Sequence, residues 1–173
     1  MASTTDNDKR PTTTVPIDPD VTIGHVHLKV ADLERSLNFY CGVLGFKLTQ
    51  RLGKEAAFVA AGNYHHHLGL NTWESEGGEP PPQGTTGLYH VALRYPTQAA
   101  LADALKRLEA ASIGLDGASD HGVSEALYLR DPDGNGLELY WDRPRELWPK
   151  DVKGELQMVT RPLDLNEMRR FER

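Results

Sequence analysis

The chain has 173 residues, 39% of them hydrophobic, and its 19 Lys plus Arg against 25 Asp plus Glu give a formal net charge of −6. This length suits one domain with a real core, and the negative charge excludes the basic footprint of a nucleic-acid-binding protein. No stretch approaches the roughly 20 apolar residues of a membrane helix, and the single Cys41 excludes an internal disulfide and favours a reducing, cytoplasmic setting.

The first half of the chain predicts a β-α-β-β-β module over residues 21–73. Residues 1–20 before it are rich in Thr, Asp and Pro and predict a flexible tail. An alternating strand over residues 21–30 is followed by Asp32, a helix N-cap, and by apolar positions at helical spacing that end at Gly45. Further strands are predicted over residues 46–52, 55–61 and 65–73.

The second half predicts the same order of elements over about residues 87–142. It follows a linker, residues 74–86, with three prolines and three glycines. A strand over residues 87–95 precedes Thr97, the cap of a second amphipathic helix. Strands are then predicted over residues 114–121, 125–130 and 136–141. The C-terminal extension is predicted over residues 149–173. The whole stretch 142–173 mixes Pro, Trp and charge, which suggests docking rather than chemistry.

The two halves also repeat a histidine motif, HVHLKV at 25–30 and HVALRY at 90–95. Symmetric halves bring equivalent positions together, so His25 and His90 are predicted to face one point on a pseudo-twofold axis. At the last strands, Glu138 in the second half matches Gly69 in the first. Glu138 is therefore the predicted third metal ligand, and Gly69 leaves one corner of the metal site open.

These motifs resemble the vicinal oxygen chelate superfamily, which includes glyoxalase I, fosfomycin-resistance enzymes, bleomycin-binding proteins and extradiol ring-cleavage dioxygenases. The resemblance covers about residues 21–148 and implies a single α+β domain. In it, paired βαβββ modules form a curved, partly open mixed sheet around a metal site, here His25, His90 and Glu138.

Within this superfamily, the stretch from His121 to Glu138 is similar to the extradiol dioxygenase signature. The matching positions are His121, Leu127, Tyr128, Asp131, Pro132, Gly134 and Glu138, and Ser119 is the one departure. The resemblance implies that His121 and Tyr128 form hydrogen bonds with the substrate oxygens. It also implies an acid/base histidine in the run 65–67: alignment selects His66, whereas strand alternation places His67 on the site's face.

Two imidazoles and one carboxylate leave three metal positions open, the arrangement of non-haem Fe(II) enzymes, with Mn(II) as an alternative metal. The resemblance implies a homodimeric extradiol dioxygenase that acts on a small aromatic diol and O₂. Three alternatives stay open: a glyoxalase- or fosfomycin-resistance-like lyase or transferase, a bleomycin-type binding protein, and a homologue that binds metal without turnover. The intact set of three ligands counts against the binding protein.

Overall fold

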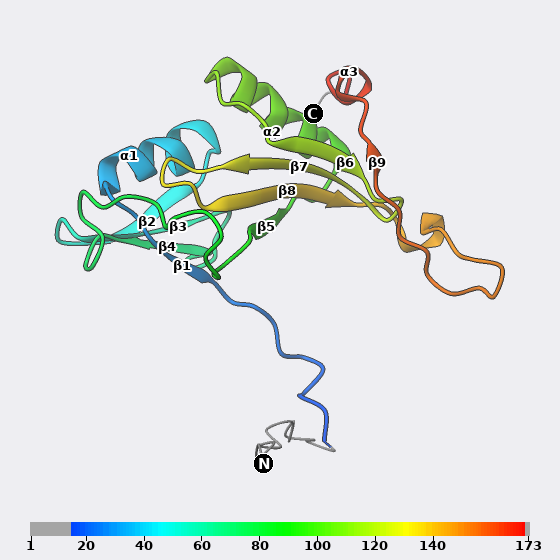
Figure 1. Ribbon diagram of the computed structural model, residues 1–173, viewed down its shortest axis with the longest axis horizontal. Coiled ribbons are helices and arrows are strands. Elements are labelled where there is room, and N and C mark those ends of the chain that lie inside the picture. The colour runs from blue at the N-terminus through cyan, green and yellow to red at the C-terminus, as the bar shows by residue number, and fades with distance from the viewer. Residues whose placement is uncertain (1–14, 172–173) are drawn as a thin grey trace, which may run out of the picture.

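Two mixed sheets frame the protein in the computed structural model, which describes residues 15–171 (Figure 1). The strand order is β1-β4-β3-β2 in the first sheet and β5-β8-β7-β6-β9 in the second. The equivalent orders confirm the internal repeat and the α+β class, although the strands form two sheets rather than one. The strands are β1 Val26–Lys29, β2 Lys47–Leu52, β3 Ala56–Ala60, β4 Leu68–Asn71, β5 Val91–Arg94, β6 Gly117–Asp120, β7 Ser124–Arg130, β8 Gly136–Asp142 and β9 Arg161–Pro162.

A helical segment follows the first strand of each sheet, and both segments lie on the same side of the sheets (Figure 1). Helix α1 (Leu33–Leu37) continues into the π-helical segment η1 (Asn38–Val43), and α2 spans Gln98–Ala110. The predicted caps are confirmed: the Asp32 side chain accepts from the Arg35 amide, and the Thr97 side chain accepts from the Ala100 amide. Each cap satisfies an amide of the first turn that has no partner within its helix.

The apolar faces of both sheets and both helical segments form one continuous core. Alternation along the strands sends every second side chain toward the helices. The largest fully buried side chains include Leu68 and Leu70 from the first sheet, Leu127, Leu137 and Leu139 from the second, and Leu101 and Leu105 from α2. Burial of each such leucine side chain stabilises the folded state by about 1.5–3 kcal/mol relative to leaving it exposed to water. The helices therefore cover only one face of each sheet, and we call the other the open face.

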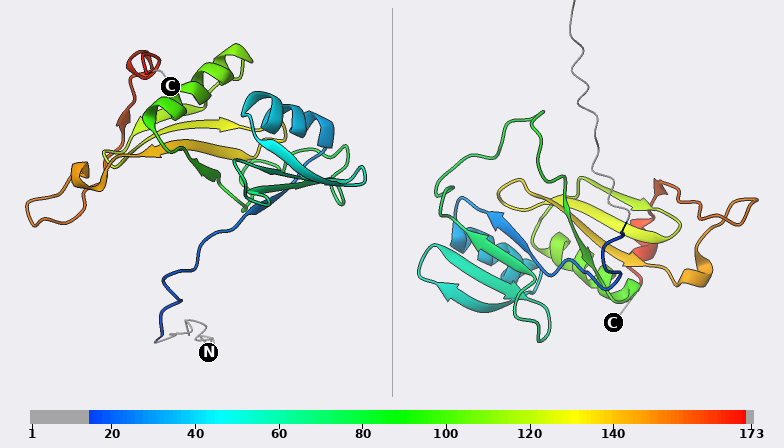
Figure 2. Two further views of the ribbon diagram at one scale, coloured as in Figure 1. Left: turned by 180° about the vertical axis from the view of Figure 1, so that it is seen from behind. Right: turned by 90° about the horizontal axis from the view of Figure 1, so that it is seen from below.

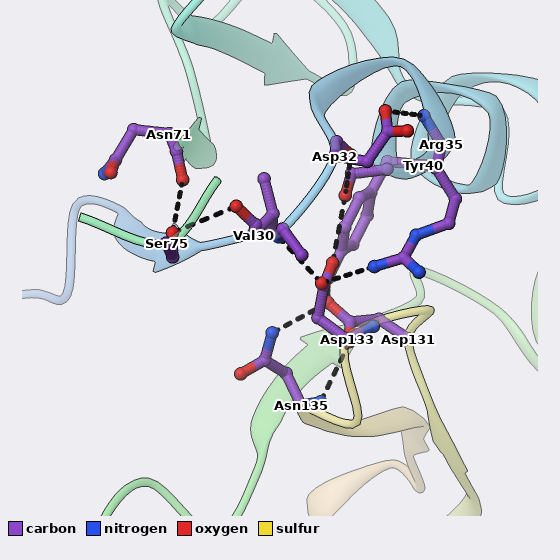
Figure 3. Close-up of polar contacts among 11 residues, drawn as sticks. Val30, Asp32, Arg35, Tyr40, Asn71, Ser75, Asp131, Asp133 and Asn135 are labelled. Atoms are coloured by element: carbon purple, nitrogen blue, oxygen red, sulfur yellow. Dashed lines mark hydrogen bonds and ion pairs between the residues drawn. The ribbon is translucent and has the colours of Figure 1, made fainter. Parts of the chain in front are cut away.

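The turn between β7 and β8 ties the second sheet to the first helix (Figure 3). Its Asp133 carboxylate accepts hydrogen bonds from the Ala31 amide and the Ser36 hydroxyl, and it pairs with Arg35. Asp131, only 4% exposed, accepts from the Tyr40 hydroxyl at 2.9 Å. We call these contacts of Asp131 and Asp133 the intermodule latch.

The first predicted strand is shorter in the structure because its pairing with β4 begins only at residue 26. The strand predicted over residues 21–30 is β1, residues 26–29, whose first residue pairs with Leu68 at the start of β4. Residues 15–24 instead leave the body on the side opposite the helices (Figures 1 and 2). Residues 1–14 of the predicted tail lie outside the described residues.

After β8 the chain makes the short helix η2 (Arg145–Leu147), passes through β9, and ends in α3 (Leu165–Met168). Met168 is buried in the core, and Arg169 pairs with Glu109 of α2. No helix in the described part of the chain is long and apolar enough to cross a membrane.

Candidate active site

One cluster of predicted site residues lies on the open face of the second sheet. His90 directly precedes β5, and Glu138 lies on β8, the parallel neighbour of β5. Leu137 and Leu139 are buried in the core, so alternation turns Glu138 to the open face. His90 Nε2 lies 3.0 Å from Glu138 Oε2. Two of the three predicted ligands are therefore in direct contact.

Tyr128 extends this cluster, because β7 places it directly opposite Glu138. Its hydroxyl lies 3.1 Å from Glu138 Oε1 and 2.8 Å from His121 Nε2, and its single proton can be donated to either acceptor. Burial, with the Glu138 carboxylate adding to the effect, raises the pKa of Tyr128 to about 12. The phenol therefore stays protonated at neutral pH. We call His90, Glu138, Tyr128 and His121 the second half-site.

A pocket of about 410 Å³ lies beside the second half-site, and His90, His121 and Tyr128 contribute to its wall. Tyr89, 80% exposed, stands next to His90 with the ring centroids 5.5 Å apart. The volume falls in the range of small-molecule sites. A single-ring ligand would fit in this volume, next to His90, His121 and Tyr128.

The other predicted residues gather on the open face of the first sheet. His25 directly precedes β1, and its ring centroid lies 4.4 Å from that of His66. The His66 ring also lies 4.9 Å from Phe58 of β3. Burial lowers the pKa of His66, and the neighbouring His25 lowers it further, so His66 is neutral near pH 7. We call His25, His66 and Phe58 the first half-site.

The run 65–67 precedes β4, so the strand alternation that favoured His67 does not extend to it. The His67 ring accepts a hydrogen bond from the Ala61 amide at 3.3 Å and thus faces a turn rather than His25. His65 Nδ1 lies 2.7 Å from His66 Nδ1. Of the three histidines, His66 has the ring that packs against His25.

Gly69, the counterpart of Glu138, lies beneath the ring of His27. A Cβ atom added to Gly69 would come within 2.9 Å of that ring. The His27 ring also packs against Phe58 and Trp73, with centroid separations of 5.9 and 5.5 Å. The corner that the sequence predicts to be open is thus occupied by the imidazole of His27, which needs glycine below it.

The two half-sites do not meet within one chain. Among residues 15–171, no group of three or more His, Cys, Asp or Glu side chains is arranged to hold a metal ion. Because α1 and α2 lie on the same side of the sheets, both open faces lie on the opposite side (Figure 1). The intermodule latch and the common core hold the modules in this arrangement.

The donor atoms nevertheless fit a divalent metal. His90 Nε2 and Glu138 Oε2 are an imidazole nitrogen and a carboxylate oxygen that already converge to 3.0 Å. His90 Nδ1 is buried without a hydrogen-bond partner in the described structure, so the contact with Glu138 sets the ring's orientation. His25 offers a second imidazole, but from the other half-site.

Sequence reasoning missed some neighbours of these residues. Phe58 packs on His66, but the alternating pattern of its strand predicts only which positions are buried and which are exposed. The main-chain oxygen of Val159 lies 3.0 Å from His121 Nδ1, across 38 residues of chain. No motif in residues 149–160 signals this contact, because a main-chain carbonyl has no residue preference.

Comparison with known proteins identifies the family of this chain and several relatives. Residues 22–139 match the family model described as the Glyoxalase/Bleomycin resistance protein/Dioxygenase superfamily. The chain is 42% identical, over 86% of its length, to a catechol-2,3-dioxygenase of Bacillus subtilis, and it spans about half of that protein, 51%. It is 27% identical to a probable lactoylglutathione lyase of Synechocystis, over 66% of this chain and 91% of that one.

The fold also matches the crystal structure of a glyoxalase/dioxygenase from Nostoc punctiforme. The TM-score is 0.62 at 19% sequence identity, and the match covers 77% of this chain and 100% of the other. At this identity the likeness concerns the fold alone.

Proposed function

This chain belongs to the Glyoxalase/Bleomycin resistance protein/Dioxygenase superfamily, and from that premise we propose that it is a cytoplasmic extradiol ring-cleavage dioxygenase. Its substrates are a small catechol-type diol and O₂. The observation that carries this proposal is the row His90, Glu138, Tyr128 and His121, joined by contacts of 2.8 to 3.1 Å. The 42% identity to a catechol-2,3-dioxygenase supports the same assignment.

His25, His90 and Glu138 would hold the metal, Fe(II) or in its place Mn(II). When bound, a metal with this donor set supplies open positions for the two diol oxygens and for O₂. The other half-site residues manage protons and orientation. His66, a neutral imidazole next to His25, accepts the proton of one diol hydroxyl. Tyr128, which stays protonated, donates a hydrogen bond to the resulting anionic oxygen.

This chemistry needs both half-sites at one point, and we propose that a second copy of the chain supplies the missing half. In the homodimer, the first half-site of one protomer faces the second half-site of its partner. The latch and the shared core oppose closure of one chain on itself. Exposed apolar side chains next to both histidines support a protein contact there: Ile23 is 90% exposed, Leu88 61% and Tyr89 80%.

The direct test is anaerobic reconstitution with Fe(II), followed by catechol or 2,3-dihydroxybiphenyl in air. We expect the yellow ring-opened semialdehyde, measured by its visible absorbance. His25→Ala and Glu138→Ala should lose both the product and the metal. If the wild type binds metal through these residues but gives no product, the lyase alternative replaces this proposal. If it binds no metal, an enzyme of either kind is refuted.

A further inference from the structure

The chain that follows the second sheet folds back onto the second half-site. Residues 149–160 form a narrow loop that projects from the end of this sheet (Figures 1 and 2). An isolated bridge between Lys150 and Leu156 and a bond from the Gln157 amide to the Pro149 carbonyl join its two sides. The returning side then enters β9, which pairs with β6. We call residues 149–160 the C-terminal loop.

The returning side of this loop contacts His121 through both its main chain and its ring. The Val159 amide donates to the His121 carbonyl at 3.1 Å, and His121 Nδ1 lies 3.0 Å from the Val159 carbonyl oxygen. The Thr160 hydroxyl lies 3.4 Å from the same nitrogen. Val159 thus fixes the imidazole relative to its own backbone.

Gly122 makes this close approach sterically feasible. A Cβ atom at this position would lie 2.8 Å from Pro149 Cγ and 3.3 Å from Val159 Cγ2. The residue also has φ +75°, which disfavours any side chain. The loop therefore sits against the 121–122 turn only because residue 122 is glycine.

The contact with Val159 determines which imidazole nitrogen carries the proton. A carbonyl oxygen only accepts hydrogen bonds, so His121 Nδ1 must be the protonated nitrogen. In the neutral ring, Nε2 then has a free lone pair and accepts a hydrogen bond from the Tyr128 hydroxyl, 2.8 Å away. The partner of one imidazole nitrogen commonly sets the role of the other in this way.

We propose that the main-chain carbonyl of Val159 is a positioning group that holds His121 in the Nδ1–H tautomer, with Nε2 aimed at Tyr128. The C-terminal loop is then part of the active site rather than only a docking extension. The role of this tautomer in ring cleavage rests on the proposed function, whereas the tautomer itself does not. Its test can therefore succeed or fail separately from the dioxygenase assay.

The experiment is long-range ¹H–¹⁵N NMR of the full chain with ¹⁵N-labelled histidine, at alkaline pH where imidazoles are neutral. The His121→Gln variant identifies the His121 signals by their loss. We expect the wild type to show the Nδ1–H tautomer at His121. An Nε2–H tautomer in the wild type overturns the proposal, whatever the variants do.

Two matched glycine variants test the role of the loop. Gly122→Ala pushes against Pro149 and Val159, whereas Gly154→Ala has a similar φ of +81° but nothing within 4 Å of the new Cβ. We expect only Gly122→Ala to shift His121 toward the Nε2–H tautomer and to lower kcat for catechol by about tenfold. If Gly122→Ala does not fold, Val159→Pro takes its place. This change removes the hydrogen bond that the Val159 amide donates to the His121 carbonyl. An unchanged tautomer in the folded variant refutes the proposal.

Discussion

Mixing two inactive variants tests the two-chain site. His25→Ala damages the first half-site, and Glu138→Ala damages the second. In a dimer that contains one chain of each kind, one site combines both damaged halves, and the other combines two intact halves. Such a heterodimer should have about half the active sites of the wild type, and a random mixture of chains about a quarter. A site built within one chain would regain none.

The assay uses co-expression of the two variants with different affinity tags and tandem purification of the heterodimer. Iron per dimer is the first readout and the rate of yellow product formation is the second, so the test does not depend on the right substrate. The control pairs Glu138→Ala with His90→Ala, both ligands in the second half-site, and should show neither metal nor activity. Purified heterodimers with no more metal or activity than this control would refute the two-chain site, as would a chain that stays monomeric.

Three further predictions follow from single contacts. Asp133→Ala removes the Asp133 contacts of the latch and should lower the free energy of unfolding by about 3 kcal/mol. Asp116→Ala, whose pair with Arg130 is exposed, should lower it by about 0.5 kcal/mol or less, and urea titration measures both. Tyr128→Phe should lower kcat about 10- to 100-fold at unchanged iron content, because only the hydroxyl is lost; iron loss instead would place Tyr128 in metal binding. Burial and the Asp131 carboxylate raise the pKa of Tyr40, so the unfolded chain loses the Tyr40 proton at a lower pH than the folded protein. The stability that Tyr40 contributes is therefore complete below about pH 10, and above that pH it falls by about 1.4 kcal/mol per pH unit. Tyr40→Phe should make this alkaline decline shallower in urea titrations at successive pH values, and an unchanged slope would contradict the assignment.

Features encoded over short distances could be predicted from the sequence. Asp32 and Thr97 cap helices because each side chain bonds an amide three residues on. Glu138 and Tyr128 lie side by side because a tight turn joins their two strands, and the register follows from it. The internal repeat thus predicts His90 and Glu138, and the family resemblance adds His121 and Tyr128.

Features that depend on contacts between distant segments could not be derived from the sequence. The placement of the two modules depends on the bond from the Ala31 amide to Asp133, which are 102 residues apart in the chain. The sequence predicts that His25 and His90 face one point, and nothing in either module reveals how the latch positions the two modules relative to each other. The choice between His66 and His67 likewise depended on where β4 begins, which its pairing with β1 determines.

The intermodule latch has a further consequence if two chains share each site. Every chain then carries half of two different centres, joined by one close-packed core and by Asp131 and Asp133. Such a core transmits displacement rather than absorbing it. Occupancy of one centre would then change the affinity of the other, and iron loading of the dimer would show a Hill coefficient different from one. The contact that separates the half-sites within a chain would thus couple the two centres of the dimer.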